Sequence, residues 1–96
     1  MDYTRLGIVV HSRKTLFGFS REDAGLGVWH VHIRSAPLRN EANREIEREC
    51  SLVFGTPVRI IRGARSVRKT ILIGLSPEKV KQILSKKSSD FLQKKS

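Results

Sequence analysis

The sequence is poor in cysteine, in long hydrophobic runs and in acidic residues, and each shortage excludes a class of protein. Cys50 is the single cysteine, which excludes an internal disulfide and a cysteine-based zinc cluster. The apolar runs are far shorter than the roughly 20 residues that a membrane-spanning helix requires. The first residues also lack the apolar stretch of a signal peptide. We therefore expect a cytoplasmic protein with no membrane partner.

The rest of the composition indicates one small folded domain. The chain has 96 residues, of which 39% are hydrophobic and 29% are charged, as is typical of a globular protein. We expect a single domain over residues 1–96, with its core at about residues 6–84 and a basic C-terminal tail at residues 85–96. We expect a monomer without a cofactor.

The shortage of acids leaves a strongly positive chain, because 19 Lys and Arg residues face 9 Asp and Glu residues, for a net charge of +10. Residues 1–48 hold 8 basic and 6 acidic residues, whereas residues 49–96 hold 11 and 3, so the two halves carry +2 and +8. Such a field concentrates anions at one end of a small protein. It favours a polyanion such as nucleic acid, although positive charge also serves solubility alone.

Short apolar runs with alternating polarity predict four strands. They lie at residues 7–11, 28–35, 58–62 and 70–73. Residues 12–27 are expected to form a short extended piece and then a turn or loop, because their polar stretch contains a glycine.

Two segments follow a helical period. In residues 40–54 the apolar positions fall on one face, and they are Ala42, Ile46, Cys50, Val53 and Phe54. Asn40 is the expected N-cap, and Gly55 and Pro57 end the helix. The opposite face carries charged residues that we expect to pair on the helix surface, namely Arg44, Glu45, Glu47, Arg48 and Glu49.

A second helix begins at Ser76-Pro77-Glu78, with a serine cap and a proline in the first turn. Its apolar stripe consists of Val80, Ile83 and Leu84, and the tail at residues 85–96 either frays or extends this helix. The element order predicts an α+β domain, a two-layer α/β sandwich in which both helices cover one sheet face. The second face is then exposed, or partly covered by residues 14–26.

The segments around residues 36–43 and 63–69 resemble the YggU-like family of small α/β proteins, which has no assigned biochemical activity. The matching positions are Pro37, Ala42, Asn43, Gly63, Ser66 and Lys69. The resemblance covers roughly residues 6–84 and implies a four-stranded mixed sheet with both helices on one face. It supplies no function.

The chain also departs from the family pattern at three of its motif positions. Asn40 stands where the family usually has glycine, and Glu41 stands where it usually has a basic residue. Val67 replaces the usual arginine, although Arg65 and Arg68 stand on either side of it.

The strongest functional signal is the basic, acid-free stretch at residues 63–69, between two strands. A hairpin tip there would bring together mutually repelling cations, a glycine and a serine. These residues are Arg62, Gly63, Arg65, Ser66, Arg68 and Lys69. Arginine forks grip phosphate oxygens, and glycine permits close backbone approach. The alternative is a solvated hairpin tip without a partner.

The start of the first helix is the second candidate. Asn43 lies in its first turn near free backbone amides, and Arg39 is close by, so this end could hold a phosphate or carboxylate. Alternatively, Asn43 is structural and bonds the adjacent loop or the basic hairpin.

The remaining candidates for chemistry are weak. His30 and His32 share a strand face and His11 could lie beside them, but no carboxylate or cysteine joins them at useful spacing, so we expect no metal site. Cys50 falls in register with the helix core and is expected to be an inert buried thiol. No catalytic triad spacing, P-loop or dinucleotide fingerprint is present.

We therefore expect a non-catalytic binding module for RNA or a ribonucleoprotein, which contacts phosphate through the basic hairpin, helped by Arg59, Arg39 and the lysine tail. One alternative is an enzyme or binding protein for a small phosphorylated or carboxylated ligand held between Asn43 and the basic loop. Another is an adaptor for an acidic protein partner.

Overall fold

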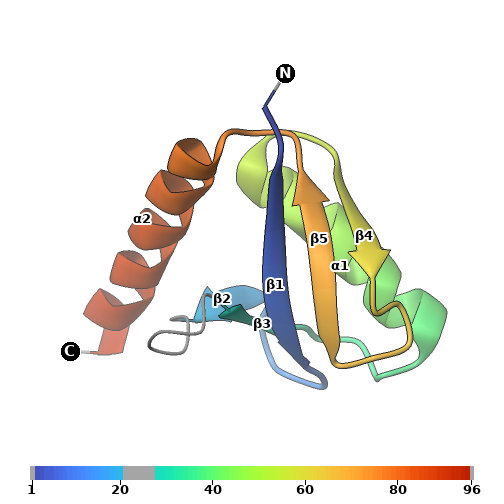
Figure 1. Cartoon of the computed structure of the whole chain (residues 1–96). Coiled ribbons are helices and arrows are strands. Elements are labelled where there is room, and N and C mark those ends of the chain that lie inside the picture. Colours follow the sequence, from blue (N-terminus) through green and yellow to red (C-terminus); the bar gives the residue numbers. More distant parts are fainter. Residues whose placement is uncertain (1, 21–27, 96) are drawn as a thin grey trace.

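The computed structural model describes residues 2–20 and 28–95 of the chain, and no side chain is described for Arg39 or for residues 87–95. The elements follow the order β1 (Thr4–His11), β2 (Gly18–Ser20), β3 (Val28–His32), α1 (Arg39–Phe54), β4 (Val58–Arg62), β5 (Arg68–Ile73) and α2 (Pro77–Lys95) (Figure 1). The predicted α+β class is confirmed. The tail continues the second helix as far as Lys95.

The sheet has five strands, so the prediction of four is wrong. The fifth strand, β2, lies in the segment at residues 12–27, where we expected only a short extended piece. It has 3 residues, which is too short for alternation to be recognised in a sequence. Phe19 in β2 lies opposite Val31 and is buried in the core. Residues 21–27, which we expected to form a turn or loop, lie outside the described residues.

The strand order in the sheet is β2-β3-β1-β5-β4. β1 and β3 are parallel, and the other neighbouring pairs are antiparallel, so the sheet is mixed. Figure 1 shows α1 behind β4 and β5, with α2 at the other side of the molecule. α2 contacts β2 and also touches α1. No helix within the described ranges is long and apolar enough to cross a membrane.

One core lies between one face of the sheet and the two helices. Alternate residues of the long strands are buried there, as are most residues of the apolar stripes of α1 and α2, and Val53 and Ile83 are partly buried and pack against them. The fully buried large side chains are Ile8, Val31, Ile33, Ile46, Cys50, Ile71, Ile73 and Leu84. Each buried aliphatic side chain stabilises the fold by about 1.5–3 kcal/mol. The predicted apolar stripes are therefore confirmed as core positions.

A buried acid ties α1 to the segment after β3. Glu45 is 3% exposed, so the prediction that it pairs on the helix surface is wrong. Its carboxylate accepts hydrogen bonds from the N–H groups of Arg34 and Ser35 and from the Ser35 hydroxyl. Burial raises the pKa of Glu45, but these donors and the Arg34 guanidinium outweigh it, and the pKa falls below its usual value.

Polar side chains of α1 also close the free edge of the sheet at β4. Glu47 accepts a hydrogen bond from the Ile60 N–H, and the Ser51 hydroxyl accepts one from the Val58 N–H, both at 2.9 Å. An edge strand with unpaired N–H groups invites pairing with another chain. Satisfying these two groups fixes α1 against β4 and makes the edge a poor template.

The helix ends confirm two of the three predicted caps. α1 begins one residue earlier than predicted, so its N-cap is Leu38, which makes no side-chain cap, and the prediction of Asn40 is wrong. Gly55 ends α1 with a φ of 67°, and its N–H donates to the Ser51 carbonyl. At the start of α2, the Ser76 hydroxyl accepts a hydrogen bond from the Lys79 N–H at 3.2 Å.

Candidate functional site

The predicted hairpin is present, and its loop, residues 63–67, depends on a glycine. β4 and β5 are antiparallel neighbours. Gly63 has a φ of 76°, and a Cβ atom there would collide with the carbonyl oxygen of Arg68. Ser66 closes the turn, because its N–H donates to the Gly63 carbonyl and its hydroxyl accepts from the Arg68 N–H at 3.0 Å. Gly63 and Ser66 therefore shape the hairpin loop.

Lys69 does not belong to the exposed cations with which the sequence grouped it. It is 7% exposed, because the sheet register places it opposite Ile8, on the face that the helices cover. Its ammonium donates to the carbonyls of Gly63 and Ala64, at 3.1 Å each. No carboxylate among the described residues forms an ion pair with it, and burial lowers its pKa.

Asn43 joins α1 to the hairpin loop. Its Nδ2 donates to the Ala64 carbonyl at 3.1 Å, the same oxygen that accepts from Lys69. The predicted bond from Asn43 to the basic hairpin is therefore present. Its other polar atom, Oδ1, is buried and accepts no hydrogen bond from any described residue. Arg39 begins α1, but its side chain lies outside the described part of the structure.

Of the cations predicted for the basic hairpin tip, Arg62, Arg65 and Arg68 are exposed. A register shift between Ile60 and Arg62 places Arg62 opposite Thr70. With regular alternation, Arg62 would lie on the same face as Ile60, which the helices cover. Residues directly opposite each other in a sheet have side chains on the same face. Arg62 therefore lies on the side of the sheet that points away from the helices, which we call the open face.

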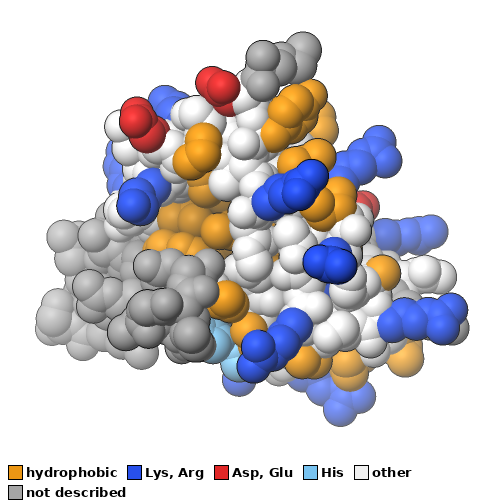
Figure 2. All heavy atoms as spheres, in the orientation of Figure 1, with side chains coloured by type: hydrophobic (Ala, Val, Ile, Leu, Met, Phe, Trp, Pro, Cys, Tyr) orange, Lys and Arg blue, Asp and Glu red, His pale blue; other side chains and the backbone are white. Residues whose placement is uncertain are grey.

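The open face carries no acid on the strands that the structure describes. The register assigns to it Arg5, Gly7, Val9, His11, Gly18, Ser20, Val28, His30, His32, Arg59, Arg62, Arg68, Thr70 and Leu72. Arg5 and Arg59 both lie opposite Leu72, on its two sides, and both are exposed. Figure 2 shows Lys and Arg side chains spread over this face of the molecule, with acidic side chains near its margins. The hairpin arginines thus continue into a wider cationic surface.

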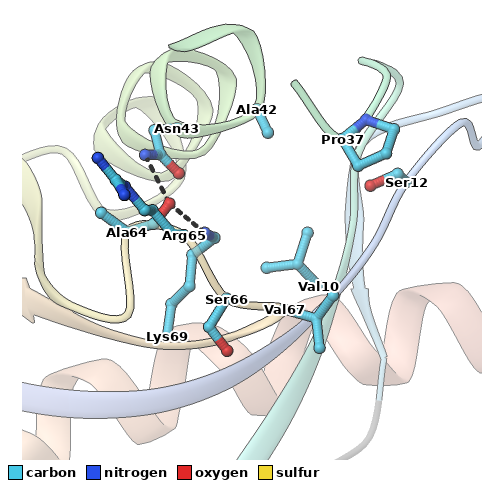
Figure 3. A pocket seen from close by; sticks show the side chains of 10 residues that line it. All are labelled: Val10, Ser12, Pro37, Ala42, Asn43, Ala64, Arg65, Ser66, Val67 and Lys69. Carbon is cyan, nitrogen blue, oxygen red and sulfur yellow. Dashed lines mark hydrogen bonds between the residues drawn. The ribbon is translucent and has the colours of Figure 1, made fainter. Parts of the chain in front are cut away.

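A small hollow, which we call the junction hollow, lies between the hairpin loop and the start of α1 (Figure 3). Its volume is about 100 Å³, and it is lined by Val10, Ser12, Pro37, Ala42, Asn43, Ala64, Arg65, Ser66, Val67 and Lys69. The polar groups of Asn43 and Lys69 meet at the Ala64 carbonyl on one side of it. Arg65 is exposed, and its guanidinium is the group in the lining that is best suited to bind a phosphate.

The three histidines lie on the open face, away from the junction hollow. Nε2 of His11 is 2.8 Å from Nδ1 of His30, and the rings of His11 and His32 stack with centroids 5.1 Å apart. Burial, followed by the charges of His11, Lys14 and His30, lowers the pKa of His32. Among the described residues, no group of histidine, cysteine or acidic side chains has the arrangement of a metal site.

Cys50 lies in the core, as its register in the helix predicted. It is fully buried, and burial, with a smaller effect from Glu49, raises its pKa to about 12. A thiol with this pKa is protonated at neutral pH and is a poor nucleophile.

No family model matches the chain. The resemblance to the YggU-like family stays a prediction, although several of its motif positions converge in the structure. Asn43, Gly63 and Lys69 are joined through hydrogen bonds to the carbonyls of the hairpin loop.

Sequence reasoning did not identify Arg5 or Ser12 as site residues. Arg5 stands alone in the sequence, and only the pairing of β1 with β5 brings it to the cationic surface. Ser12 follows the first strand without any motif of its own.

Proposed function

We propose that the protein is a non-catalytic binding module for RNA or a ribonucleoprotein. The observation that supports it is the open face, where Arg5, Arg59, Arg62 and Arg68 are exposed on neighbouring strands and no acidic side chain lies between them. Guanidinium groups bind phosphate oxygens in pairs of hydrogen bonds. A row of them spread over a sheet suits the spaced phosphates of a polynucleotide better than one small anion.

The alternative of a small phosphorylated or carboxylated ligand near Asn43 has less support. The junction hollow, at about 100 Å³, is smaller than the roughly 300–1,000 Å³ of pockets that enclose small molecules. None of the histidines, the candidate general bases, is among the residues that line it.

A second, larger hollow lies at the other end of the sheet and does not favour an anion either. It has a volume of about 470 Å³ and is lined by Asp2, Tyr3, Thr56, Pro57, Gly74, Leu75 and Ser76. Its charged lining residue is an acid, Asp2, which repels phosphate and carboxylate groups.

The test is fluorescence anisotropy with labelled single-stranded RNA, duplex RNA and duplex DNA over a series of salt concentrations. The variant replaces Arg62, Arg65 and Arg68 by Gln and leaves the buried Lys69 in place. The matched control replaces Lys79, Lys81 and Lys86 of α2 by Gln, because these side chains are also exposed and the change in net charge is the same.

We expect binding to single-stranded RNA near physiological salt, with a steep salt dependence. Each phosphate contact with a single strand contributes about 0.7 to the slope of log K against log salt, so the arginine variant should lose roughly 2 units of slope. The control should lose clearly less. Equal losses in the two variants would mean that net charge alone attracts RNA. Retained binding to an acidic protein with no binding to any nucleic acid would favour the adaptor alternative.

A further inference from the structure

The open face has a place at β2 where the strand carries no side chain. Gly18 of β2 lies directly opposite His32 of β3, so both belong to the open face. A Cβ atom added to Gly18 would meet no described atom within 4 Å. The space above Gly18, next to His32 in the strand pairing, is therefore open among the described residues. We call this place the His32 site.

The ring of His32 is held from its other side. It stacks on the ring of His11, from the neighbouring strand β1, with an interplanar angle of 20° and centroids 5.1 Å apart. Nε2 of His32 is 3.0 Å from the Ser20 hydroxyl, and a hydrogen bond at this atom engages the edge of the ring and not its face. Because β1 and β2 lie on opposite sides of β3, the stack leaves the face of the ring toward Gly18 uncovered by described residues.

Positive charge lies beside the His32 site. Lys14 is exposed, and its N–H donates to the carbonyl of Ile33, the residue after His32, at 2.8 Å. Burial, then the charges of His11 and Lys14, lower the pKa of His32. The imidazole is therefore largely neutral at pH 7 and is better suited to stacking than to binding an anion. Figure 2 shows histidine surface beside Lys and Arg side chains.

A ring face next to a cation fits one class of ligand, an unpaired nucleobase with its phosphate. Unpaired bases of RNA stack on aromatic side chains, histidine among them, and every base has a π face. A base in a duplex is paired and stacked on its neighbours, so it does not reach the space above Gly18. An apolar ligand would make no use of the cation, and a lone anion would make no use of the ring.

We propose that the His32 site receives an unpaired base of single-stranded RNA. The proposal rests on the proposed function of RNA binding. The base lies above Gly18 and extends the stack of His32 on His11. Lys14 binds a phosphate of the same strand, which then crosses β1 toward Arg68 on β5. The arginines of the open face supply the attraction to phosphate, and the His32 site supplies the contact with a base.

The experiment measures fluorescence anisotropy near physiological salt with three labelled ligands: an RNA single strand, its duplex with the complementary strand, and an abasic ribose-phosphate strand of the same length. The abasic strand keeps the phosphates and lacks the bases. The native protein should bind the single strand at least roughly fivefold more tightly than the abasic strand, as expected for one stacked base. The duplex is the ligand on which the variants below should have no effect.

Two pairs of variants assign this preference for the single strand to the site. His32→Phe keeps an aromatic ring and should retain the preference, whereas His32→Leu lacks a ring and should lose it. Gly18→Leu fills the space beside His32 and should also lose the preference. Gln82→Leu adds the same side chain at an exposed position of α2 and should retain it. Cooperative unfolding in urea checks that each variant folds, and if Gly18→Leu does not, the two His32 variants decide the question.

The outcomes separate this inference from the proposed function. Equal binding of the single strand and the abasic strand by the native protein overturns the base site and leaves phosphate binding by the open face standing. An equal preference in His32→Phe and His32→Leu also overturns it, because the aromatic ring would then have no part in binding. Folded Gly18→Leu that keeps the native preference overturns it as well. Binding of none of the three ligands overturns the proposed function and the base site with it.

Discussion

A graded series of glycine substitutions tests the hairpin that carries the candidate site. Gly18 has an ordinary backbone and open space around it, Gly55 has a positive φ and open space, and Gly63 has a positive φ and a backbone carbonyl in the way. Replacement of each by Ala therefore adds one physical effect at a time. The loss of unfolded-chain entropy is similar in all three variants, so it cancels when they are compared.

The expected losses of stability follow from these surroundings. Gly18→Ala should change the free energy of unfolding by less than about 0.5 kcal/mol. Gly55→Ala should cost about 1–2 kcal/mol, the penalty of a side chain in the left-handed region. Gly63→Ala should cost at least about 3 kcal/mol, because the Arg68 carbonyl must also move and distort its bond angles. For a domain of this length, each kcal/mol lowers the melting temperature by roughly 4–8 °C.

The assay is equilibrium unfolding in urea, followed by the fluorescence of Trp29. Trp29 is the single tryptophan and packs against the core, so its emission reports global unfolding. The midpoint should fall in the order Gly18→Ala, Gly55→Ala, Gly63→Ala, with the slope of the transition unchanged. If Gly63→Ala is no less stable than Gly55→Ala, the close approach of Gly63 to the Arg68 carbonyl does not exist and the hairpin loop has another conformation.

Two further predictions concern buried titratable groups. The pKa of Glu45 is lowered in the folded state, so its stabilisation is present above pH 4.5 and is lost as the pH falls through the folded pKa. Glu45→Gln should therefore lower the free energy of unfolding by about 1–3 kcal/mol at pH 7. Urea titrations at several pH values should show this difference in stability from the native protein shrinking below pH 4.5. A difference that stays constant with pH would contradict the role of the carboxylate charge. Cys50, with its pKa raised to about 12, should react with a thiol reagent at pH 8 only after addition of urea, and rapid reaction in the folded state would show that the thiol is accessible.

The sequence by itself determined the class of the fold and most of its elements. Alternation predicted the strands around Val31 and Ile71, and the helical period placed Ile46 and Cys50 in the core. Gly55 and Ser76 marked helix ends by local stereochemistry alone. These signals succeed because they depend on residues within a few positions of each other. They indicated only a short extended piece where β2 lies, because its 3 residues become a strand by pairing with β3.

The tertiary structure decided which charged side chains are free to act. The sequence grouped Lys69 with the hairpin arginines and placed Glu45 on a helix surface, but both are buried. The reason is that burial of a charge depends on partners distant in the chain, here the carbonyls of residues 63 and 64 for Lys69 and the N–H groups of residues 34 and 35 for Glu45.

The position of the cationic surface also followed from pairing between distant segments. The bulge in β4 turned Arg62 to the open face, and the register of β1 with β5 brought Arg5 to the same face, opposite Leu72. A local pattern states which residues are basic, but the face on which a side chain lies is set by register, which forms only when the strands meet. The sequence therefore indicated an anionic partner, and the fold determined which of its cations could reach one.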